Sequence, residues 1–301
     1  MKVLITGGVG FIGAHLVGAL AAAGDEVVAL DNLRRGDVAK LPEGVRFVEG
    51  DIRDRAAVRA ALDGCARVYH LAAQSNVLGA VSDADYSFTS NVVGTYNVLA
   101  AARDAGVERM VFTSSREAYG EVGQLPVAEE QAMNPKNAYG ASKAAGEVYC
   151  RAFQGTYDLD VSVLRLANVY GPGDRDRVIP IWLDRARRGL DLELYGGEQV
   201  LDLVPVELVV RALRRAAETA LDGQPVNVGS GQGVTLRDLA ARVRALPGVS
   251  VGLRVLPARS VEVTRFVADV TRMRNLLGLE PPDEPLVDLR RLWDSAQTPG
   301  R

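Results

Sequence analysis

A tyrosine and a lysine four residues apart could form a catalytic base in this chain. Tyr139 and Lys143 lie in the segment Asn137-Ala138-Tyr139-Gly140-Ala141-Ser142-Lys143, and a helix would place both side chains on one face. A free tyrosine has a pKa of about 10 and is almost fully protonated at neutral pH. A cation about 4 Å away, at an effective dielectric near 20, supplies about 4 kcal/mol toward ionising it. The pair is therefore a candidate for removing a proton from an alcohol.

Glycines near the N-terminus predict a site for a dinucleotide. Gly8, Gly10 and Gly13 form a Gly-x-Gly-x-x-Gly pattern between a strand-like run and a helix-like run. Such glycines let the backbone approach a pyrophosphate, whose charge meets free amides at the start of the helix. Asp31 ends the next strand-like run, eighteen residues after Gly13, where a carboxylate would accept ribose hydroxyls and repel a 2′-phosphate. We therefore expect NAD rather than NADP.

Strand-like and helix-like segments alternate through the first half of the chain and would position these residues. The expected strands are Lys2 to Thr6, Glu26 to Leu30, Val45 to Val48, Ala66 to Leu71, Glu108 to Thr113 and Val161 to Leu166. The expected helices are Phe11 to Ala23, Arg55 to Leu62, Asp85 to Ala105 and Tyr139 to Tyr157. Alternation with mostly apolar strands predicts an α/β fold with a doubly wound parallel sheet.

The composition excludes several classes of function. The 301 residues are 48% hydrophobic and 24% charged, with a net charge of −3, so there is no basic footprint for nucleic acid or an anionic membrane. No apolar run approaches the roughly 20 residues that span a bilayer, and no signal-like segment opens the chain, so we expect a cytoplasmic protein. The only histidines are His15 and His70, which argues against a metal site and a Ser-His-Asp hydrolase.

Further motifs accompany the glycines and the Tyr139/Lys143 pair over nearly the whole chain. They are Asp31-Asn32-Leu33, Gly50-Asp51-Ile52-Arg53, His70-Leu71-Ala72-Ala73-Gln74, Asn91-Val92-Val93-Gly94-Thr95, Thr113-Ser114-Ser115-Arg116-Glu117-Ala118-Tyr119-Gly120, Arg165-Leu166-Ala167-Asn168-Val169-Tyr170-Gly171-Pro172-Gly173 and Val226-Asn227-Val228-Gly229-Ser230-Gly231. With them the chain resembles an extended short-chain dehydrogenase/reductase of the NAD-dependent nucleotide-sugar epimerase/dehydratase type. The resemblance implies a Rossmann-type NAD-binding domain, residues 1–167 plus 205–234, and a smaller nucleotide-sugar-binding lobe, residues 168–204 plus 235–301. It also implies a homodimer formed through the helices of residues 85–105 and 139–157, although core packing would explain their apolar residues equally well.

The resemblance also implies roles for individual residues. Tyr139 would take the proton of a sugar hydroxyl as hydride moves to NAD, Ser115 would hydrogen-bond the same oxygen, and Lys143 would bridge Tyr139 to the cofactor. The residues implied around NAD are Gly7, Gly10, Phe11, Ile12, Gly13, Asp31, Asn32, Asp51, Ile52, Leu71, Ala72, Ala73, Gln74, Asn91 and Thr113, together with Tyr139 and Lys143.

For the substrate, a nucleoside diphosphate sugar, the resemblance implies contacts by Ser115, Asn168, Arg175 and Val178. Arg177 is a further candidate for the phosphates. One position departs from the family, since Leu201 stands where relatives usually carry an arginine that contacts the diphosphate. We expect another arginine, Arg175 or Arg265, to replace it.

The reaction itself depends on Arg116 and Glu117. Related 4,6-dehydratases resemble Thr-Asp-Glu at positions 115–117, with the glutamate as C5 base and the aspartate as acid. This chain keeps the glutamate, but Arg116 cannot deliver a proton. Arg116 could bind a uronate carboxylate, pair with Glu117 or point away. We therefore expect a 4-epimerase acting through a 4-keto intermediate, similar to UDP-glucose or UDP-hexose 4-epimerases. An NDP-sugar dehydratase of the 4,6 or 5,6 type using Glu117, a uronate decarboxylase and a noncatalytic NAD-binding regulator stay open as alternatives.

Overall fold

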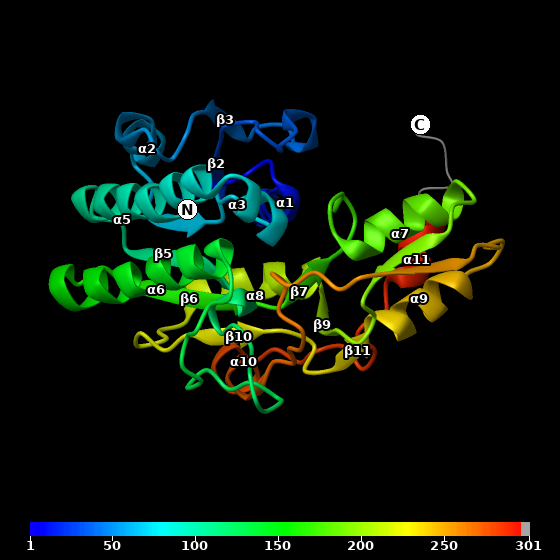
Figure 1. The fold of residues 1–301 in the computed structure, drawn as a ribbon. Coiled ribbons are helices and arrows are strands. Elements are labelled where there is room, and N and C mark those ends of the chain that lie inside the picture. The colour runs from blue at the N-terminus through cyan, green and yellow to red at the C-terminus, as the bar shows by residue number, and fades with distance from the viewer. Residues whose placement is uncertain (296–301) are drawn as a thin grey trace.

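The structure is a computed structural model that describes residues 1–295, and its centre is a sheet of seven parallel strands (Figure 1). The strand order is β10-β6-β5-β4-β1-β2-β3. The strands are β1 (Lys2–Thr6), β2 (Glu26–Asp31), β3 (Arg46–Glu49), β4 (Arg67–His70), β5 (Arg109–Ser115), β6 (Val161–Leu166) and β10 (Val226–Val228). Every strand predicted in the first half is present, within one or two residues at its ends.

Helices cover both faces of this sheet, because alternate residues of each strand point to opposite sides. One core contains Val3 and Ile5 of β1 with α1 (Phe11–Ala22), α8 (Val206–Glu218) and α10 (Thr271–Leu277). The other contains Leu4 of the same strand with α2 (Arg55–Leu62), α5 (Gly94–Asp104) and α6 (Ala138–Tyr157). The predicted α/β doubly wound fold is confirmed.

A smaller lobe lies beside the carboxyl-end edge of the sheet, at the right of Figure 1. It holds β7 (Asn168–Tyr170), β9 (Val200–Pro205) and β11 (Gly233–Thr235) in one small sheet, and β8 (Leu192–Tyr195) with β12 (Leu253–Leu256) in another. The helices are α7 (Val178–Arg187), α9 (Leu236–Arg244) and α11 (Leu289–Ser295). These helices share a third core, in which Trp182 and Trp293 are buried. The lobe thus has its own apolar interior.

One segment predicted in the lobe packs elsewhere. Phe266, Ala268, Met273 and Leu277 belong to the core of the large sheet, because α10 contacts β10 and α8. The lobe prediction also included residues 296–301, which lie outside the described residues.

The predicted helix Asp85 to Ala105 is divided in the structure. It comprises α4 (Ala84–Phe88), a π-helical turn (Thr89–Val93) and α5, and it follows the short helix α3 (Val77–Ser82). π turns commonly mark functional sites because they re-aim one side chain. Here the turn carries Asn91, which was predicted near the cofactor. Two 3₁₀ turns, Val38–Lys40 and Arg116–Ala118, complete the elements.

Within residues 1–295, no helix is long and apolar enough to span a membrane. The same residues contain no group of three or more His, Cys, Asp or Glu side chains that could hold a metal ion.

Candidate active site

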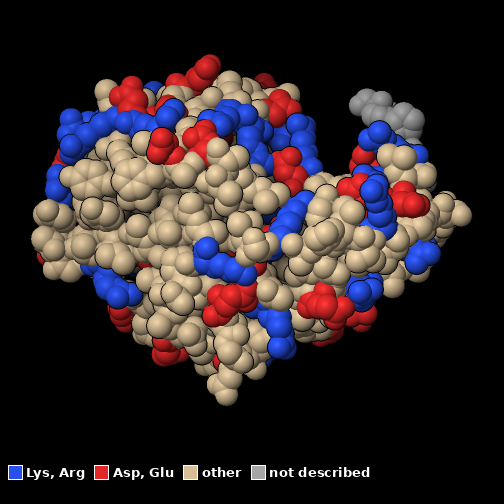
Figure 2. All heavy atoms as spheres, in the orientation of Figure 1, with Lys and Arg blue, Asp and Glu red and all other residues tan. Residues whose placement is uncertain are grey.

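A cleft of about 790 Å³ runs between the carboxyl ends of the central strands and the smaller lobe. Figure 2 shows the hollow between the two parts of the molecule. The cleft passes the ends of β1, β2, β4 and β5, then the loop after β7 and the start of α7. In open α/β sheets, the usual ligand site is the crevice at the carboxyl ends of the strands, at the point where the strand order reverses. Here the order reverses at β1, which lies between β4 and β2.

The glycine turn at the end of β1 leaves room for a pyrophosphate. Gly7 has a φ of +71°, and a Cβ added there would lie 2.7 Å from the backbone nitrogen of Ala72. A Cβ on Gly13 would lie 2.0 Å from the carbonyl oxygen of Gly7. Gly10 caps α1 without any side-chain acceptor, so the first amides of α1 are open to an anion in the cleft. Gly8 instead packs on Ala29 and does not line the cleft.

The end of β2 places carboxylates where a ribose would bind. Asp31 accepts hydrogen bonds from the amides of Leu33 (2.9 Å) and Val9 (3.3 Å), and burial raises its pKa. Asn32 donates to Asp51 at 2.9 Å. Burial acts to raise the pKa of Asp51, but hydrogen bonds from Arg53 hold it at about 2. The two carboxylates can accept hydrogen bonds from ribose hydroxyls. The glycine cradle and the carboxylates therefore fit a dinucleotide.

Asn91 supports the cofactor side of the cleft from behind. Its Nδ2 donates to Ser142 Oγ in α6 at 2.9 Å and to the carbonyl of Gln74 at 3.0 Å, and its Oδ1 accepts from the Gln74 amide at 2.7 Å. The carboxamide thus fixes the loop after β4 against α6. Asn91 does not line the cleft, whereas all the other predicted cofactor residues do, namely Gly7, Gly10, Phe11, Ile12, Gly13, Asp31, Asn32, Asp51, Ile52, Leu71, Ala72, Ala73, Gln74, Thr113, Tyr139 and Lys143.

Tyr139 stands in the first turn of α6, and it lines the cleft together with Ser115. Burial raises the pKa of Tyr139, while Arg177 and Ser115 act in the opposite direction. Lys143 directs its ammonium to the carbonyl of Thr113 at 2.8 Å, and burial lowers its pKa to about 8. Burial outweighs the nearby charges at Tyr139, and the ammonium of Lys143 is engaged by Thr113, so the lowering of the Tyr139 pKa by Lys143 stays a prediction.

Arg116 and Glu117 form a buried ion pair beside Ser115. Arg116 Nη2 lies 2.8 Å from Glu117 Oε1, and its Nε donates to Asn168 Oδ1 at 3.3 Å. The second carboxylate oxygen of Glu117 accepts from Asn137 Nδ2 at 2.8 Å. Arg116 thus pairs with Glu117 and does not point away from the cleft, and its binding of a uronate carboxylate stays a prediction. Among residues 1–295, Arg116 Nη1 has no hydrogen-bond partner.

Several arginines face the substrate end of the cleft. Arg175 and Arg177 line it, as do Val178, Asn168 and Leu201. Arg265 does not. Its side chain is exposed, and its backbone bridges to Val200 outside the cleft, because the extended segment turns it away.

Arg259 lines the cleft, although no pattern in the sequence had marked it as a site residue. Its guanidinium lies 3.8 Å from the ring centroid of Tyr195 and 3.1 Å from Glu262. Its position directly after the strand-like Leu253–Leu256 is the signal that could have suggested it, since residues at the ends of strands meet at one edge.

The geometry has counterparts among known proteins. The family model described as "NAD dependent epimerase/dehydratase family" matches residues 3–229. The UDP-glucose 4-epimerase of Mycolicibacterium smegmatis is 37% identical over 293 residues, 93% of this chain and 94% of that protein. Among solved structures, the UDP-glucose 4-epimerase of Thermotoga maritima with UDP-glucose superposes with a TM-score of 0.95 at 33% identity, over 99% of both chains. The dTDP-glucose 4,6-dehydratase of Streptomyces venezuelae, solved with NAD bound, gives a TM-score of 0.93 at 32% identity, over 99% of this chain and 97% of that one.

Proposed function

Because the chain belongs to the NAD dependent epimerase/dehydratase family, we propose that it is a nucleotide-sugar 4-epimerase that acts through a transient 4-keto sugar. The resemblance inferred from the motifs is confirmed, and so is NAD as the cofactor. UDP-hexoses are the proposed substrates, since the similar proteins include UDP-glucose 4-epimerases. Fold similarity alone does not favour this reaction, because a dehydratase superposes nearly as well.

The ion pair of Arg116 with Glu117 is the observation that favours epimerisation over dehydration. Both carboxylate oxygens of Glu117 are engaged, one by Arg116 and the other by Asn137. A C5 base must present a free oxygen to the sugar, and dehydration also needs an acid where Arg116 stands. A guanidinium is not such an acid. Epimerisation at C4 needs only a group that removes and returns the hydroxyl proton.

Tyr139 and Ser115 are proposed to handle that proton. When bound, NAD accepts a hydride from C4 and returns it. As the hydride leaves, Tyr139 would take the O4 proton, and a positioned base of this kind contributes roughly 10²- to 10⁴-fold. Ser115 would hydrogen-bond the same oxygen, and Lys143 would keep the phenol and the cofactor in position relative to each other. Rotation of the 4-keto sugar within the cleft would present the opposite face of C4, so that the hydride would return to that face while Tyr139 returns the proton to O4, and C4 would be inverted.

Arg259 and Arg177 are proposed to bind the diphosphate in place of an arginine at position 201. Both line the cleft. Each guanidinium pairs with one carboxylate but is not enclosed by it, because each side chain is about one third exposed. Arg175 is more exposed and lies 4.0 Å from Asp37. Charge-assisted contacts to phosphate oxygens are the strong kind of hydrogen bond. Asn168 and Val178 would contact the remainder of the nucleotide.

We propose that two copies of the chain associate through α5 and α6. Large apolar side chains on this face are exposed, including Phe88 (57%), Val148 (55%), Tyr149 (42%) and Tyr157 (48%). Figure 2 shows that charged side chains are sparse over these helices. A contiguous apolar surface of this kind is typical of an association site. Sedimentation velocity should give a dimer for the parent and a monomer for Val148→Glu/Tyr149→Glu, and a monomeric parent at 50 μM would contradict the proposal.

The domain division and the cellular location are also proposals. We propose a cofactor domain of residues 1–167 plus 205–234, extended by residues 266–279 because they pack in its core. The remaining residues 168–204, 235–265 and 280–295 would form the substrate lobe. A cytoplasmic location is supported by Cys65 and Cys150, which are both buried and unpaired, as expected in a reducing compartment.

The reaction can be tested with NAD and a panel of UDP-, dTDP-, GDP- and CDP-sugars, UDP-glucuronate included. Products would be followed by chromatography with mass detection. A new isomer of unchanged mass supports the epimerase. Loss of water or of carbon dioxide would identify a dehydratase or a decarboxylase, and no change with any sugar would favour a noncatalytic NAD-binding protein.

The role of Glu117 needs a paired substitution. Glu117→Gln alone would leave the Arg116 charge buried without its carboxylate, which typically costs about 3–5 kcal/mol. The double variant Arg116→Met/Glu117→Gln removes both charges. We expect it to bind NAD and epimerise within about tenfold of the parent, since neither residue moves a proton in this scheme. A loss of a hundredfold or more in a folded, NAD-bound double variant would instead support a base role for Glu117.

A further inference from the structure

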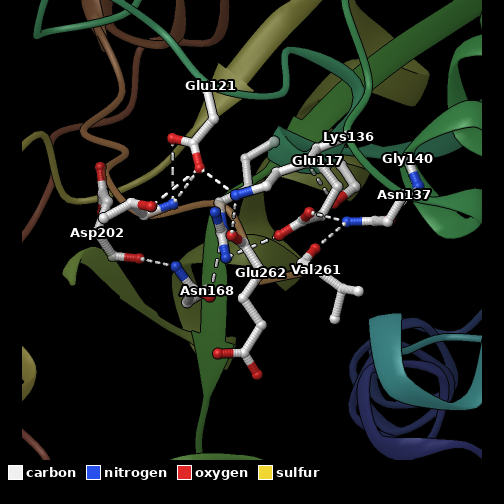
Figure 3. A network of polar contacts seen from close by, with 12 residues as sticks. Glu117, Glu121, Lys136, Asn137, Gly140, Asn168, Asp202, Val261 and Glu262 are labelled. Atoms are coloured by element: carbon white, nitrogen blue, oxygen red, sulfur yellow. Dashed lines mark hydrogen bonds and ion pairs between the residues drawn. The ribbon is translucent and has the colours of Figure 1, made fainter. Parts of the chain in front are cut away.

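Asn137 connects three parts of the active site through one carboxamide (Figure 3). Its Oδ1 accepts a hydrogen bond from the amide of Gly140 at 2.9 Å and so caps α6, the helix that carries Tyr139. Its Nδ2 donates to Glu117 Oε2 at 2.8 Å and to the carbonyl oxygen of Val261 at 3.1 Å. The amide therefore uses its acceptor on the catalytic helix and both donor directions on other segments.

The segment that Val261 belongs to contains Arg259 and has no regular secondary structure. Residues 257–264 form turns and loop between β12 and the short bridge at Arg265. Backbone groups of such a segment must find partners outside a sheet or helix. The carbonyl of Thr264 accepts from the amide of Val200 in the lobe at 2.9 Å, and three further groups find partners in the catalytic domain. Val261 bonds Asn137, the carbonyl of Glu262 accepts from Lys136 Nζ at 2.9 Å, and the amide of Thr264 donates to Glu121 at 3.0 Å.

Lys136 and Glu121 also bond each other, at 2.7 Å, so the three side chains act as one support for the segment. Figure 3 shows Glu121, Lys136 and Asn137 around Val261 and Glu262. Arg259 precedes the supported carbonyls by two and three residues and faces the cleft. Its own contacts, with Tyr195 and Glu262, stay within the lobe. This support therefore links the segment that carries Arg259 to the part of the chain that carries Tyr139.

We propose that Asn137 is a positioning residue that fixes the lobe segment 259–264 against the catalytic helix, and thereby holds the diphosphate of the substrate at a set distance from Tyr139. This inference rests on the proposed function, since it assigns the diphosphate to Arg259. An asparagine is required because serine or aspartate at this position would still cap α6 but could not donate to both Glu117 and Val261: serine has a single hydroxyl proton on a shorter side chain, and aspartate has no donor.

The test compares Asn137→Ser, which keeps the cap and loses both N–H donors of the carboxamide, with Asp54→Ala. Asp54 caps α2, away from the cleft, through the amide of Ala56 at 2.8 Å. In the Asn137→Ser holoenzyme, hydrogen exchange of residues 259–266 should be at least about fivefold faster, as expected for loss of about 1 kcal/mol of local support. The KM for the nucleotide sugar should rise about tenfold while kcat and NAD affinity change less than about threefold. Asp54→Ala should change neither readout.

Several outcomes would overturn the proposal. Unchanged exchange and unchanged KM in Asn137→Ser would reduce Asn137 to a helix cap. An equal loss of kcat and NAD affinity would place the effect in α6 itself. If Asn137→Ser does not fold, Lys136→Met replaces it in the test, because it removes the contact to the carbonyl of Glu262. This variant should show smaller increases in the exchange of residues 259–266 and in the KM. If neither quantity rises, the proposal is contradicted. A parent enzyme that turns over no nucleotide sugar would refute the proposed function, whereas the exchange measurement would still decide the role of Asn137.

Discussion

Replacing Lys143 by methionine should make the protein more stable and nearly inactive. The Lys143 side chain is buried, with 4% of the residue exposed, and only the carbonyl of Thr113 accepts from its ammonium among the described residues. Burial lowers the pKa from 10.5 to about 8. By linkage, a difference of this size corresponds to about 3 kcal/mol of folding free energy lost at neutral pH.

Methionine keeps an unbranched chain of similar length and removes the charge. The variant should recover about 3 kcal/mol and lose about 1 kcal/mol with the hydrogen bond to Thr113, a net gain of about 2 kcal/mol at pH 7. The sign follows from the two pKa values. The unfolded lysine stays protonated up to about 10.5 and the folded one only up to about 8. The parent therefore gains stability as the pH rises from 8 to 10.5, and the advantage of the variant should fall by about 3 kcal/mol over that window.

The assay is urea unfolding of the cofactor-free proteins, followed by circular dichroism at pH 7 and at pH 10. Other groups titrate equally in both proteins, so the difference between them isolates Lys143. Lys143→Arg is the matched control, because it keeps a buried charge and should show no gain. The reasoning is refuted if Lys143→Met is less stable than the parent at pH 7, or if the difference between them is the same at both pH values. Turnover should fall at least about a hundredfold, since the group that aligns Tyr139 is gone.

Three further substitutions test the proposed roles one at a time. Tyr139→Phe should lower turnover by two or more orders of magnitude with NAD affinity unchanged, and activity within tenfold of the parent would remove Tyr139 from the mechanism. Asp31→Asn should weaken NAD binding about tenfold or more, the usual effect of losing a charge-assisted hydrogen bond. It should also reduce the preference for NAD over NADP. Equal NAD affinities for the parent and the variant would contradict the ribose contact. Arg259→Met should weaken UDP binding about tenfold or more in calorimetry, with NAD binding as the internal control. Retained UDP affinity would assign the diphosphate to other arginines, with Arg177 the first to examine.

Features set by local backbone geometry were predictable from the sequence. The glycine turn, Asp31 at the end of β2 and the Tyr139/Lys143 pair each depend on one βα unit, and a periodic pattern specifies such a unit. The same holds for the pairing of Arg116 with Glu117, which are adjacent in the chain and whose pairing was one of three alternatives.

Contacts between distant segments were not predictable in this way. Asn137 and Val261 are 124 residues apart, and the segment around Arg259 has no apolar period that would place it. Arg265 was expected at the substrate because it is an arginine in the right region, but which way an extended segment turns each side chain depends on its register, here the bridge to Val200. A shift of one residue reverses the face.

Ser115 joins the structural and chemical roles of this site. Its Oγ accepts a hydrogen bond from the amide of Glu117 at 3.2 Å and caps the 3₁₀ turn Arg116–Ala118. A hydroxyl has one proton to donate and two lone pairs to accept with. Because the Glu117 amide occupies a lone pair, the Ser115 proton stays available for Tyr139 or for the sugar oxygen. The buried ion pair of Arg116 and Glu117 can therefore serve the site without transferring a proton. It fixes the 3₁₀ turn in which the Glu117 amide orients Ser115. In the proposed reaction this hydroxyl and the phenol of Tyr139 would act on the same sugar oxygen, which suits the removal and return of a single proton.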